Sequence, residues 1–311
     1  MRAMILAAGQ GKRLRPLTNK IPKPLIEVTN QPIILDVIGR LRGFGIDEVL
    51  INVSYLGDQI ISCVETSGIK NVHFIKEPFP YGTGGALINA FSRLGNDPFI
   101  LCNADIYTEI DFNLLPNVTD AAHIIGVENP SHNISGDFCL SDGIVTLNSV
   151  NELTWSGISL IHPQILEPFL NNKIPFDIWN VIFKPNIKKQ LLTGSTSTDL
   201  WVDIGTPETL ELARKLVKEE KNVAAAIGFG GAIIGFAIAL GSAASNSVAV
   251  IDFAIWALVA VIAQSLAFAI LRFSFMPKIA ERINNNEVSA GVMLASMSIA
   301  VGLLNAACMT Y

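Results

Sequence analysis

A glycine-rich turn flanked by basic residues follows the first apolar run of the chain. Residues 6–18 read LAAGQGKRLRPLT, and PKPL follows at residues 22–25. A turn of this kind after a strand exposes backbone N–H groups that can cradle phosphate oxygens. The segment lacks the spacing of a Walker loop and the third glycine of a dinucleotide fingerprint. We therefore expect a phosphate ligand, with a basic surface turn as the alternative. The residues concerned are Gly9, Gly11, Lys12, Arg13, Arg15 and Lys23.

The elements that position this turn alternate along the first 220 residues. Short β-rich runs are separated by amphipathic stretches of helical length, a pattern typical of an α/β domain with helices on both faces of a sheet. The expected strands are residues 3–6, 48–53, 72–76, 99–102, 122–127 and 156–161. The expected helices are residues 33–44, 57–66, 84–94, 163–169 and 207–218. Thr206 is the expected N-cap of the last helix, because Pro207 suits the first helical position.

Charge divides the chain into two unlike parts. The 311 residues carry a net charge of −5, with 22 Lys and Arg against 27 Asp and Glu. An acidic chain of this kind argues against a protein that binds nucleic acid through a basic surface. The charged residues after Asn222 sum to zero, so the net charge belongs to the first part. They are Asp252, Arg272, Lys278, Glu281, Arg282 and Glu287.

Three apolar segments follow Asn222, at about residues 224–240, 251–273 and 289–310. Each is near the roughly 20 residues that cross a bilayer. We expect a transmembrane domain over residues 222–311 and a separate domain over residues 1–221, with buried globular helices as the alternative. Basic residues flank the first span and the connection between the second and third, which predicts a cytoplasmic N-terminal domain on the inner membrane. These residues are Lys215, Lys218, Lys221, Arg272, Lys278 and Arg282.

The apolar part also contains a weak internal repeat. NVAAAI at residues 222–227 is similar to NEVSAGV at residues 286–292, and each segment opens a span rich in small residues. Small residues such as Gly231 and Gly235 predict close helix packing. The polar residues to examine within the spans are Asp252, Gln264, Asn305 and Cys308. For Asp252, solvation at the outer membrane boundary is the alternative to a functional role.

Cysteines and histidines point to no site of their own. Cys63, Cys102, Cys139 and Cys308 show no paired or metal-type spacing, so we expect free thiols. The four histidines are dispersed along the chain, and we expect them to be structural. They are His73, His123, His132 and His162.

Taken together, the motifs resemble the signature of the sugar-1-phosphate nucleotidylyltransferases. The resemblance rests on GxGxRxxPLT and PKPL, on GTGG at residues 82–85, on FILCNAD at 99–105 and on WVDIGTPE at 201–208. NP at residues 129–130, GDF at 136–138 and LTWSGI at 153–158 are similar to the N-acetylmuramate α-1-phosphate uridylyltransferases of cell-wall recycling. The resemblance implies a Rossmann-like mixed-sheet fold of the GT-A type.

The resemblance also implies roles for the phosphate loop and two carboxylates. Asp105 and Asp203 would hold Mg²⁺, the expected cofactor, with a turn residue and a helix cap as their respective alternatives. Arg13 and the Gly11 amide would hold the triphosphate, and Lys23 would neutralise charge around the reacting phosphates. The loop residues assigned to the nucleotide in this way are Gly9, Gly11, Lys12, Arg13 and Lys23.

Further residues are implied for the base and the sugar. Thr83 and Gly85 would lie beside the base, and Asn103 would touch the nucleotide or its ribose. Asp137 and Glu152 would contact sugar hydroxyls, with a solvated loop charge as the alternative for Glu152. UTP and N-acetylmuramate α-1-phosphate are the expected substrates.

Other substrates and another class of function remain open. The same reaction on mannose 1-phosphate with GTP, or on glucose 1-phosphate with dTTP or UTP, fits the same motifs. A membrane protein whose N-terminal domain senses nucleotide without catalysis is the alternative from a different class.

Residues 222–311 resemble the YjfL-like inner-membrane proteins of unknown function, most clearly in the ending GLLNAACMTY. Members of that family usually have four spans, and three are recognisable here. The membrane part is therefore expected to contact the lipid bilayer as an anchor, to use a partner helix or an oligomer, or to be a fusion without a task of its own.

Overall fold

The computed structural model describes residues 1–29, 31–220, 222–284 and 286–309, and it divides into two compact units. The first unit is Met1–Arg214 and the second is Lys215–Tyr311, so the division lies within helix α5 (Pro207–Glu220). The sequence places the boundary later, at residues 221 and 222. Lys221, Thr310 and Tyr311, which entered the expected boundary and spans, lie outside the described residues.

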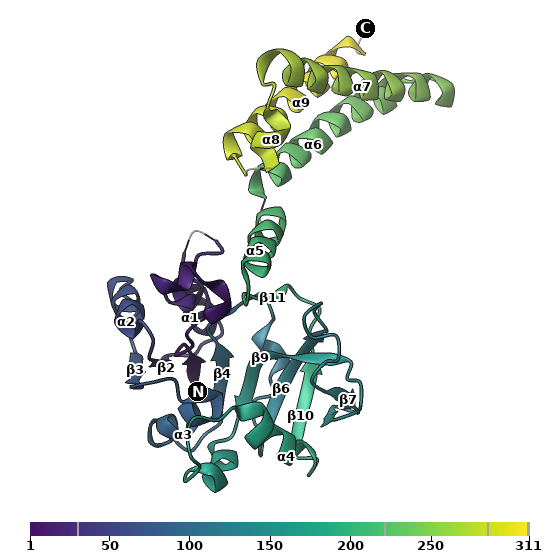
Figure 1. Ribbon diagram of the computed structural model, residues 1–311. Helices are drawn as coiled ribbons and strands as arrows, with labels where there is room; N and C mark the ends of the chain where they lie inside the picture. The colour runs from purple at the N-terminus through teal and green to yellow at the C-terminus, as the bar shows by residue number, and fades with distance from the viewer. Residues whose placement is uncertain (30, 221, 285, 310–311) are drawn as a thin grey trace. The chain divides into compact units, whose positions relative to one another are not determined.

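A nine-stranded sheet of mixed direction forms the first unit, in the order β3-β2-β1-β4-β9-β6-β10-β8-β7 (Figure 1). β3, β2, β1 and β4 run parallel, whereas β9 is antiparallel to both β4 and β6. These strands confirm the expected mixed-sheet α/β fold. Their bounds are Arg2–Leu6 (β1), Glu48–Val53 (β2), Val72–Lys76 (β3), Phe99–Asn103 (β4), Ala122–Glu128 (β6), Cys139–Ser141 (β7), Ile144–Thr146 (β8), Leu153–Ile161 (β9) and Leu192–Thr196 (β10).

The first unit also contains a separate sheet of two strands. β5 (Ile106–Thr108) pairs in antiparallel fashion with β11 (Trp201–Asp203). The pairing brings the end of the domain back to the residues that directly follow β4. It thereby joins two segments almost 100 residues apart at one point.

Helices cover the sheet because their apolar stripes pack on it. Leu87 and Leu94 of α3 (Gly82–Leu94) belong to the same core as Met4 of β1, Leu50 of β2 and Phe99 of β4, and all five are buried. The remaining helices of this unit are α1 (Ile33–Gly43), α2 (Gly57–Thr66) and the short α4 (Lys184–Ile187). Tighter 3₁₀ turns cover Lys12–Leu14, Leu17–Asn19, Lys23–Leu25, Phe112–Leu114 and Pro163–Phe169, and a π-helical turn covers Trp179–Phe183.

The strand order reverses at β1, which places the site. After β1 the chain adds β2 and β3 on one side and then returns to add β4 on the other. The loops that leave the carboxyl ends of β1 and β4 therefore diverge and leave a crevice between them, the usual ligand position in such sheets. The glycine-rich turn follows β1, and Asp105 follows β4.

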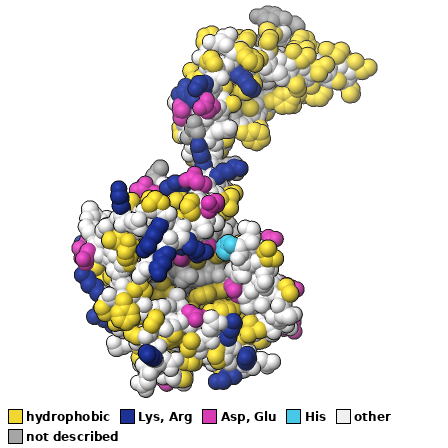
Figure 2. Space-filling model, viewed as in Figure 1, with side chains coloured by type: hydrophobic (Ala, Val, Ile, Leu, Met, Phe, Trp, Pro, Cys, Tyr) yellow, Lys and Arg dark blue, Asp and Glu magenta, His cyan; other side chains and the backbone are white. Residues whose placement is uncertain are grey.

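Three helices of the second unit are long and apolar enough to cross a membrane. They include α6 (Val223–Asn246), α7 (Val250–Ile270) with the π-helical turn Leu271–Phe275, and α9 (Val288–Cys308), while α8 (Ile279–Asn284) is short. At 1.5 Å per residue, a helix of 21 residues is about 32 Å long, which matches the hydrocarbon thickness of about 30 Å. Hydrophobic side chains dominate the surface of this unit (Figure 2).

The two halves of the internal repeat pack against each other as parallel helices. A methyl group at Gly231 of α6 would overlap Cβ of Ala295 in α9, and further along Ser242 Oγ donates to the Ala306 carbonyl at 3.1 Å. Both pairs are 64 positions apart, the same shift that relates Asn222 to Asn286 in the repeat. The shift of the repeat thus recurs in contacts between the two helices, and glycine lets their backbones approach closely.

Candidate functional site

Contacts with Thr18 and the backbone conformation of Gly11 define the shape of the glycine-rich turn. Gly11 has a left-handed backbone, with φ of +59°, and a methyl group there would lie 2.9 Å from Cγ2 of Thr18. Thr18 Oγ1 donates to the Gly11 carbonyl at 2.8 Å. A residue other than glycine would meet both an unfavourable φ and a steric overlap at this position. The sequence GQG thus sets the path of the loop between β1 and the turn that carries Lys12 and Arg13.

A buried polar chain ties the ends of β1 and β2 to the start of α3. Asn52 Oδ1 accepts from the Ala7 amide at 2.9 Å, and Asn52 Nδ2 donates to Glu77 Oε1 at 2.8 Å. Glu77 Oε2 in turn accepts from the Tyr81 amide at 2.9 Å. Burial raises the pKa of the Glu77 carboxyl, while the hydrogen bonds from Tyr81 and Asn52 oppose that shift. The chain fixes the GTGG turn relative to the phosphate loop.

A pocket of about 170 Å³ opens where these segments meet. Figure 2 shows a hollow in the first unit, with Lys and Arg side chains along one rim and a histidine on the other side. The pocket is lined by the end of β1, the turn after β4 and the start of α3. Its residues are Leu6, Ala7, Ala8, Gly9, Lys23, Pro24, Asn52, Pro80, Gly82, Thr83, Asn103, Ala104 and Asp105.

Two carboxylates converge on one buried ammonium group beside this pocket. Lys23 Nζ lies 2.7 Å from Asp105 Oδ2 and 3.6 Å from Asp203 Oδ1, and Lys23 is only 7% exposed. The small sheet brings the carboxylates together, since the Ile204 amide donates to the Asp105 carbonyl at 3.0 Å. Arg13 Nη2 approaches Asp203 Oδ2 at 4.0 Å. A cation position shared by two carboxylates is therefore built into the fold.

The donor set at this position suits a hard divalent cation. In the described part of the chain, no group of three or more His, Cys, Asp and Glu side chains is arranged to hold a metal ion. Mg²⁺ commonly binds through one or two carboxylates and completes its coordination with phosphate oxygens and water. Asp105 and Asp203, which already face one cation, fit that mode of binding and leave room for a phosphate substrate.

The expected nucleotide residues fall partly inside and partly outside the pocket. Gly9, Thr83 and Asn103 line it, and Thr83 Oγ1 also accepts from the Ile178 amide at 2.9 Å. Lys12 is exposed on the loop. Gly85 is buried behind the pocket lining, where its amide donates to the Phe176 carbonyl at 3.3 Å.

The two expected sugar residues differ in their surroundings. Both carboxylate oxygens of Asp137 are engaged, with the Trp155 amide donating to Oδ2 at 2.9 Å and Asn133 Nδ2 donating to Oδ1 at 3.2 Å. Glu152 is exposed just before β9. A sugar contact by either residue stays a prediction.

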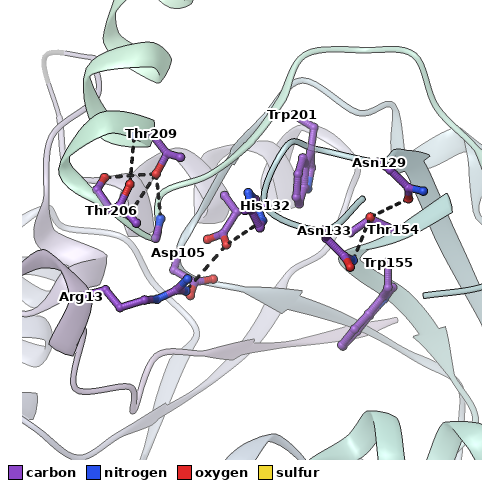
Figure 3. Close-up of polar contacts among 12 residues, drawn as sticks. Arg13, Asp105, Asn129, His132, Asn133, Thr154, Trp155, Trp201, Thr206 and Thr209 are labelled. Carbon is purple, nitrogen blue, oxygen red and sulfur yellow. Dashed lines mark hydrogen bonds and ion pairs between the residues drawn. The ribbon is translucent and has the colours of Figure 1, made fainter. Parts of the chain in front are cut away.

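One residue near the carboxylates was not expected from the sequence. His132 Nε2 lies 3.7 Å from Asp203 Oδ2, and Figure 3 shows the imidazole on the side of Asp105 that faces Asn133. Of the other histidines, His123 and His162 make hydrogen bonds within the first unit, and His73 is exposed on β3 near Glu48. His123 bonds to Thr193 and Ser195 inside the sheet, and His162 accepts from the Gln164 amide at the start of a 3₁₀ turn. The sequence signal that could have pointed to His132 is its position between the NP and GDF motifs.

The cysteines of this unit take no part in the site. Cys102 precedes Asn103 on β4, and burial raises the pKa of its thiol to about 12. A thiol with such a pKa stays protonated and unreactive at neutral pH.

Comparison with known proteins identifies two families along the chain. Residues 2–126 match the model of the nucleotidyl transferase family, and residues 206–309 match a domain of unknown function, DUF350. The second match agrees with the membrane family of unknown function expected for the C-terminal part.

Curated relatives match the enzyme part, and two of them are named for different activities. An N-acetylmuramate α-1-phosphate uridylyltransferase from Neisseria meningitidis serogroup B is 35% identical over 228 residues, which cover 70% of this chain and 98% of the relative. A mannose-1-phosphate guanylyltransferase catalytic subunit beta from Drosophila pseudoobscura pseudoobscura is 31% identical, and the match covers 67% of this chain but only 60% of that relative.

Solved structures agree with the fold. HddC from Yersinia pseudotuberculosis, in complex with GMP-PN, is 28% identical with a TM-score of 0.58, covering 69% of this chain and 98% of the neighbour. A putative glucose-1-phosphate thymidylyltransferase from Bacillus anthracis has a TM-score of 0.61 at 20% identity, over 70% of this chain and 95% of the neighbour, and so shares the fold. With the convergent carboxylates, the phosphate loop and a relative matched over almost its whole length, the chain belongs to the nucleotidyl transferase family as a sugar-1-phosphate nucleotidyltransferase.

Proposed function

We propose that this enzyme transfers a uridylyl group from UTP to N-acetylmuramate α-1-phosphate. An oxygen of the sugar 1-phosphate attacks the α-phosphorus of UTP, the bond from that phosphorus to the bridging oxygen breaks, and pyrophosphate leaves. The observation that carries the proposal is the shared cation position of Lys23, Asp105 and Asp203 beside the pocket. The name of the Neisseria relative, an N-acetylmuramate α-1-phosphate uridylyltransferase, supports the choice of base and sugar.

The phosphate loop and its cations bring two anions together. Gly9 and Gly11 direct backbone amides at the triphosphate, and Lys12 and Arg13 place positive charge on the exposed side of the loop. Lys23 neutralises the reacting phosphates from the buried side. The nucleophile is already ionised, so the work of the site is positioning and charge neutralisation.

Two carboxylates beside these cations could hold a metal ion. Asp105 and Asp203 would hold Mg²⁺, which stabilises negative charge on phosphate oxygens when it is bound. Lys23 Nζ lies near both carboxylates, at 2.7 Å from Asp105 and 3.6 Å from Asp203, and so adds positive charge next to the metal position.

Base and sugar lie on opposite sides of this charged centre in the proposal. Thr83 and Asn103 face the nucleoside, with Gly85 supporting the turn from behind, and Asp137 and Glu152 belong to the sugar side. The pocket beside the GTGG turn holds the uracil and ribose, because it continues directly from the phosphate loop.

The membrane unit anchors the enzyme to the inner membrane with the catalytic unit in the cytoplasm. The support is the three apolar helices and the basic residues that flank them, such as Lys218 and Arg272. The product is a cell-wall precursor, which suggests a place in cell-wall recycling at the surface where such precursors are used. Alkaline extraction of isolated membranes tests the anchor, since an integral protein stays in the pellet.

A substrate panel tests the reaction. The full chain in detergent is incubated with Mg²⁺, with UTP, GTP or dTTP, and with N-acetylmuramate, mannose or glucose 1-phosphate, and pyrophosphate release is measured. Preference for UTP with N-acetylmuramate α-1-phosphate supports the proposal. Preference for GTP with mannose 1-phosphate would replace it with the activity named for the Drosophila relative. No release with any pair would favour a nucleotide-sensing role.

A further inference from the structure

The charged centre receives side chains from two separate parts of the first unit. In the described residues, Asp203 lies within 4.0 Å of the cationic groups of Arg13 and Lys23 and of the imidazole of His132. Arg13 and Lys23 come from the segment after β1, which the proposed function assigns to the triphosphate. His132 comes from the loop between β6 and β7, in the other half of the sheet. The sugar 1-phosphate must approach the metal position from a different direction than the triphosphate. A hydrogen-bond donor on the side of His132 would serve this second reactant.

The loop that carries His132 is firmly attached to β9. Asn129 accepts from Thr154 Oγ1 at 2.9 Å and donates to the Asn151 carbonyl at 2.8 Å, and Asn133 Nδ2 donates to Thr154 Oγ1 at 3.0 Å (Figure 3). Gly136, with φ of +62°, lets the loop approach so closely that a methyl group there would clash with the Asn151 carbonyl. The loop therefore presents His132 from a fixed base.

His132 itself is available to a ligand. Its side chain is 40% exposed, and 3.7 Å from Nε2 to Asp203 Oδ2 is too long for a hydrogen bond. An imidazole N–H donates a hydrogen bond in either charge state once the tautomer is set. An oxygen placed between His132 and the metal position can thus be held from both sides.

We propose that His132 binds an anionic oxygen of the sugar 1-phosphate substrate. This inference rests on the proposed function, because that function assigns the reacting phosphates to Lys23, Asp105 and Asp203. The oxygen belongs either to the 1-phosphate or to the carboxylate that distinguishes N-acetylmuramate from N-acetylglucosamine. Asp137, whose oxygens anchor the loop, then acts as a positioning residue for His132.

Steady-state kinetics of His132→Gln in the full detergent-solubilised chain test the inference. Loss of a charge-assisted hydrogen bond to substrate should raise the KM for the sugar 1-phosphate about 10-fold or more and leave the KM for UTP within about twofold. His73→Gln is the matched control, since His73 is an exposed histidine on β3, near Glu48. It should change neither constant.

Two sugar substrates separate the two sources of the oxygen. A KM increase with both N-acetylmuramate and N-acetylglucosamine 1-phosphates identifies the phosphate, and an increase with the former alone identifies the carboxylate. An unchanged sugar KM, or an equal rise in the KM for UTP, overturns the inference. If the unaltered chain does not accept N-acetylmuramate 1-phosphate, the proposed substrate is wrong. The KM of His132→Gln is then compared with that of the unaltered chain for whichever sugar 1-phosphate the unaltered chain accepts.

Discussion

Replacing Lys23 by methionine should destabilise the first unit in a way that Mg²⁺ reverses. The substitution keeps most of the apolar stem and removes the ammonium group that lies 2.7 Å from Asp105 and 3.6 Å from Asp203. The two carboxylates then lose the ammonium group that they share, and Arg13 stays near Asp203 alone, at 4.0 Å. Their repulsion, together with the lost ion pairs, lowers the stability of the folded state.

The exposure of the three side chains sets the magnitude. Loss of one partner from a fully buried pair costs about 3–5 kcal/mol, whereas exposed pairs contribute about 0–1 kcal/mol. The Lys23 side chain is 9% exposed, but those of Asp105 and Asp203 are 40% and 22% exposed. We therefore expect a loss of about 1–3 kcal/mol, between those limits. For a unit of this size the unfolding midpoint should fall by about 2–12 °C.

Thermal unfolding of the full chain in detergent, with and without Mg²⁺, measures the effect. Mg²⁺ should raise the midpoint of Lys23→Met more than that of the unaltered chain, because only the variant lacks a cation between the carboxylates. Lys20→Met, on the same loop but exposed, serves as the control. Equal midpoints for Lys23→Met and the unaltered chain without Mg²⁺ would refute the shared cation position.

Three further outcomes are expected. Gly11→Ala meets a φ of +59° and a contact of 2.9 Å with Thr18, so the KM for UTP should rise about 10-fold or more as the loop shifts. Burial lowers the pKa of His123 from 6.5, so the unfolded state binds an extra proton below that pH and stability should decrease as the pH falls from 7 to 5; His123→Gln should flatten this dependence in thermal melts. Gly235→Ala places a methyl group against the carbonyl oxygen of Ser298 in α9 and should lower the melting midpoint of the membrane unit. Gly230→Ala on the same helix, with nothing within 4 Å, should not.

The parallel half of the sheet was predictable because its strands are continuous apolar runs. The expected strands at 3–6, 48–53, 72–76 and 99–102 correspond to β1 to β4. β5 and β11 were not expected, since three-residue strands have no periodicity of their own and form only through pairing with each other. That pairing places Asp203 beside Asp105, which local sequence patterns alone do not reveal.

Some residues of the site could be predicted from the sequence, and others could not. Lys23, Asp105 and Asp203 stand in motifs that a family resemblance can recognise, and the fold brings them together. His132 stands on a loop whose position depends on contacts of Asn129 and Asn133 with β9, so its distance to Asp203 follows only from the tertiary structure. Glu77 was missed because a single acidic residue after a strand is usually solvated.

In the membrane unit, by contrast, a sequence feature relates directly to a tertiary contact. The weak repeat and its small residues predicted close helix packing, and the structure shows that the two repeated segments, in α6 and α9, are the helices that pack together. Small residues at equivalent positions are what both helices need for close approach, so the sequence similarity and the contact share one physical cause.

Transfer of label from the α-phosphate of UTP tests the central claim most directly. With Mg²⁺ and N-acetylmuramate α-1-phosphate, the full chain should move the labelled α-phosphate into a UDP-sugar and release unlabelled pyrophosphate. Asp105→Asn, which keeps the shape of the side chain but removes its charge, should lower this rate by about 100-fold or more. Label that stays in UTP with the unaltered chain, or an unchanged rate with Asp105→Asn, would contradict the account.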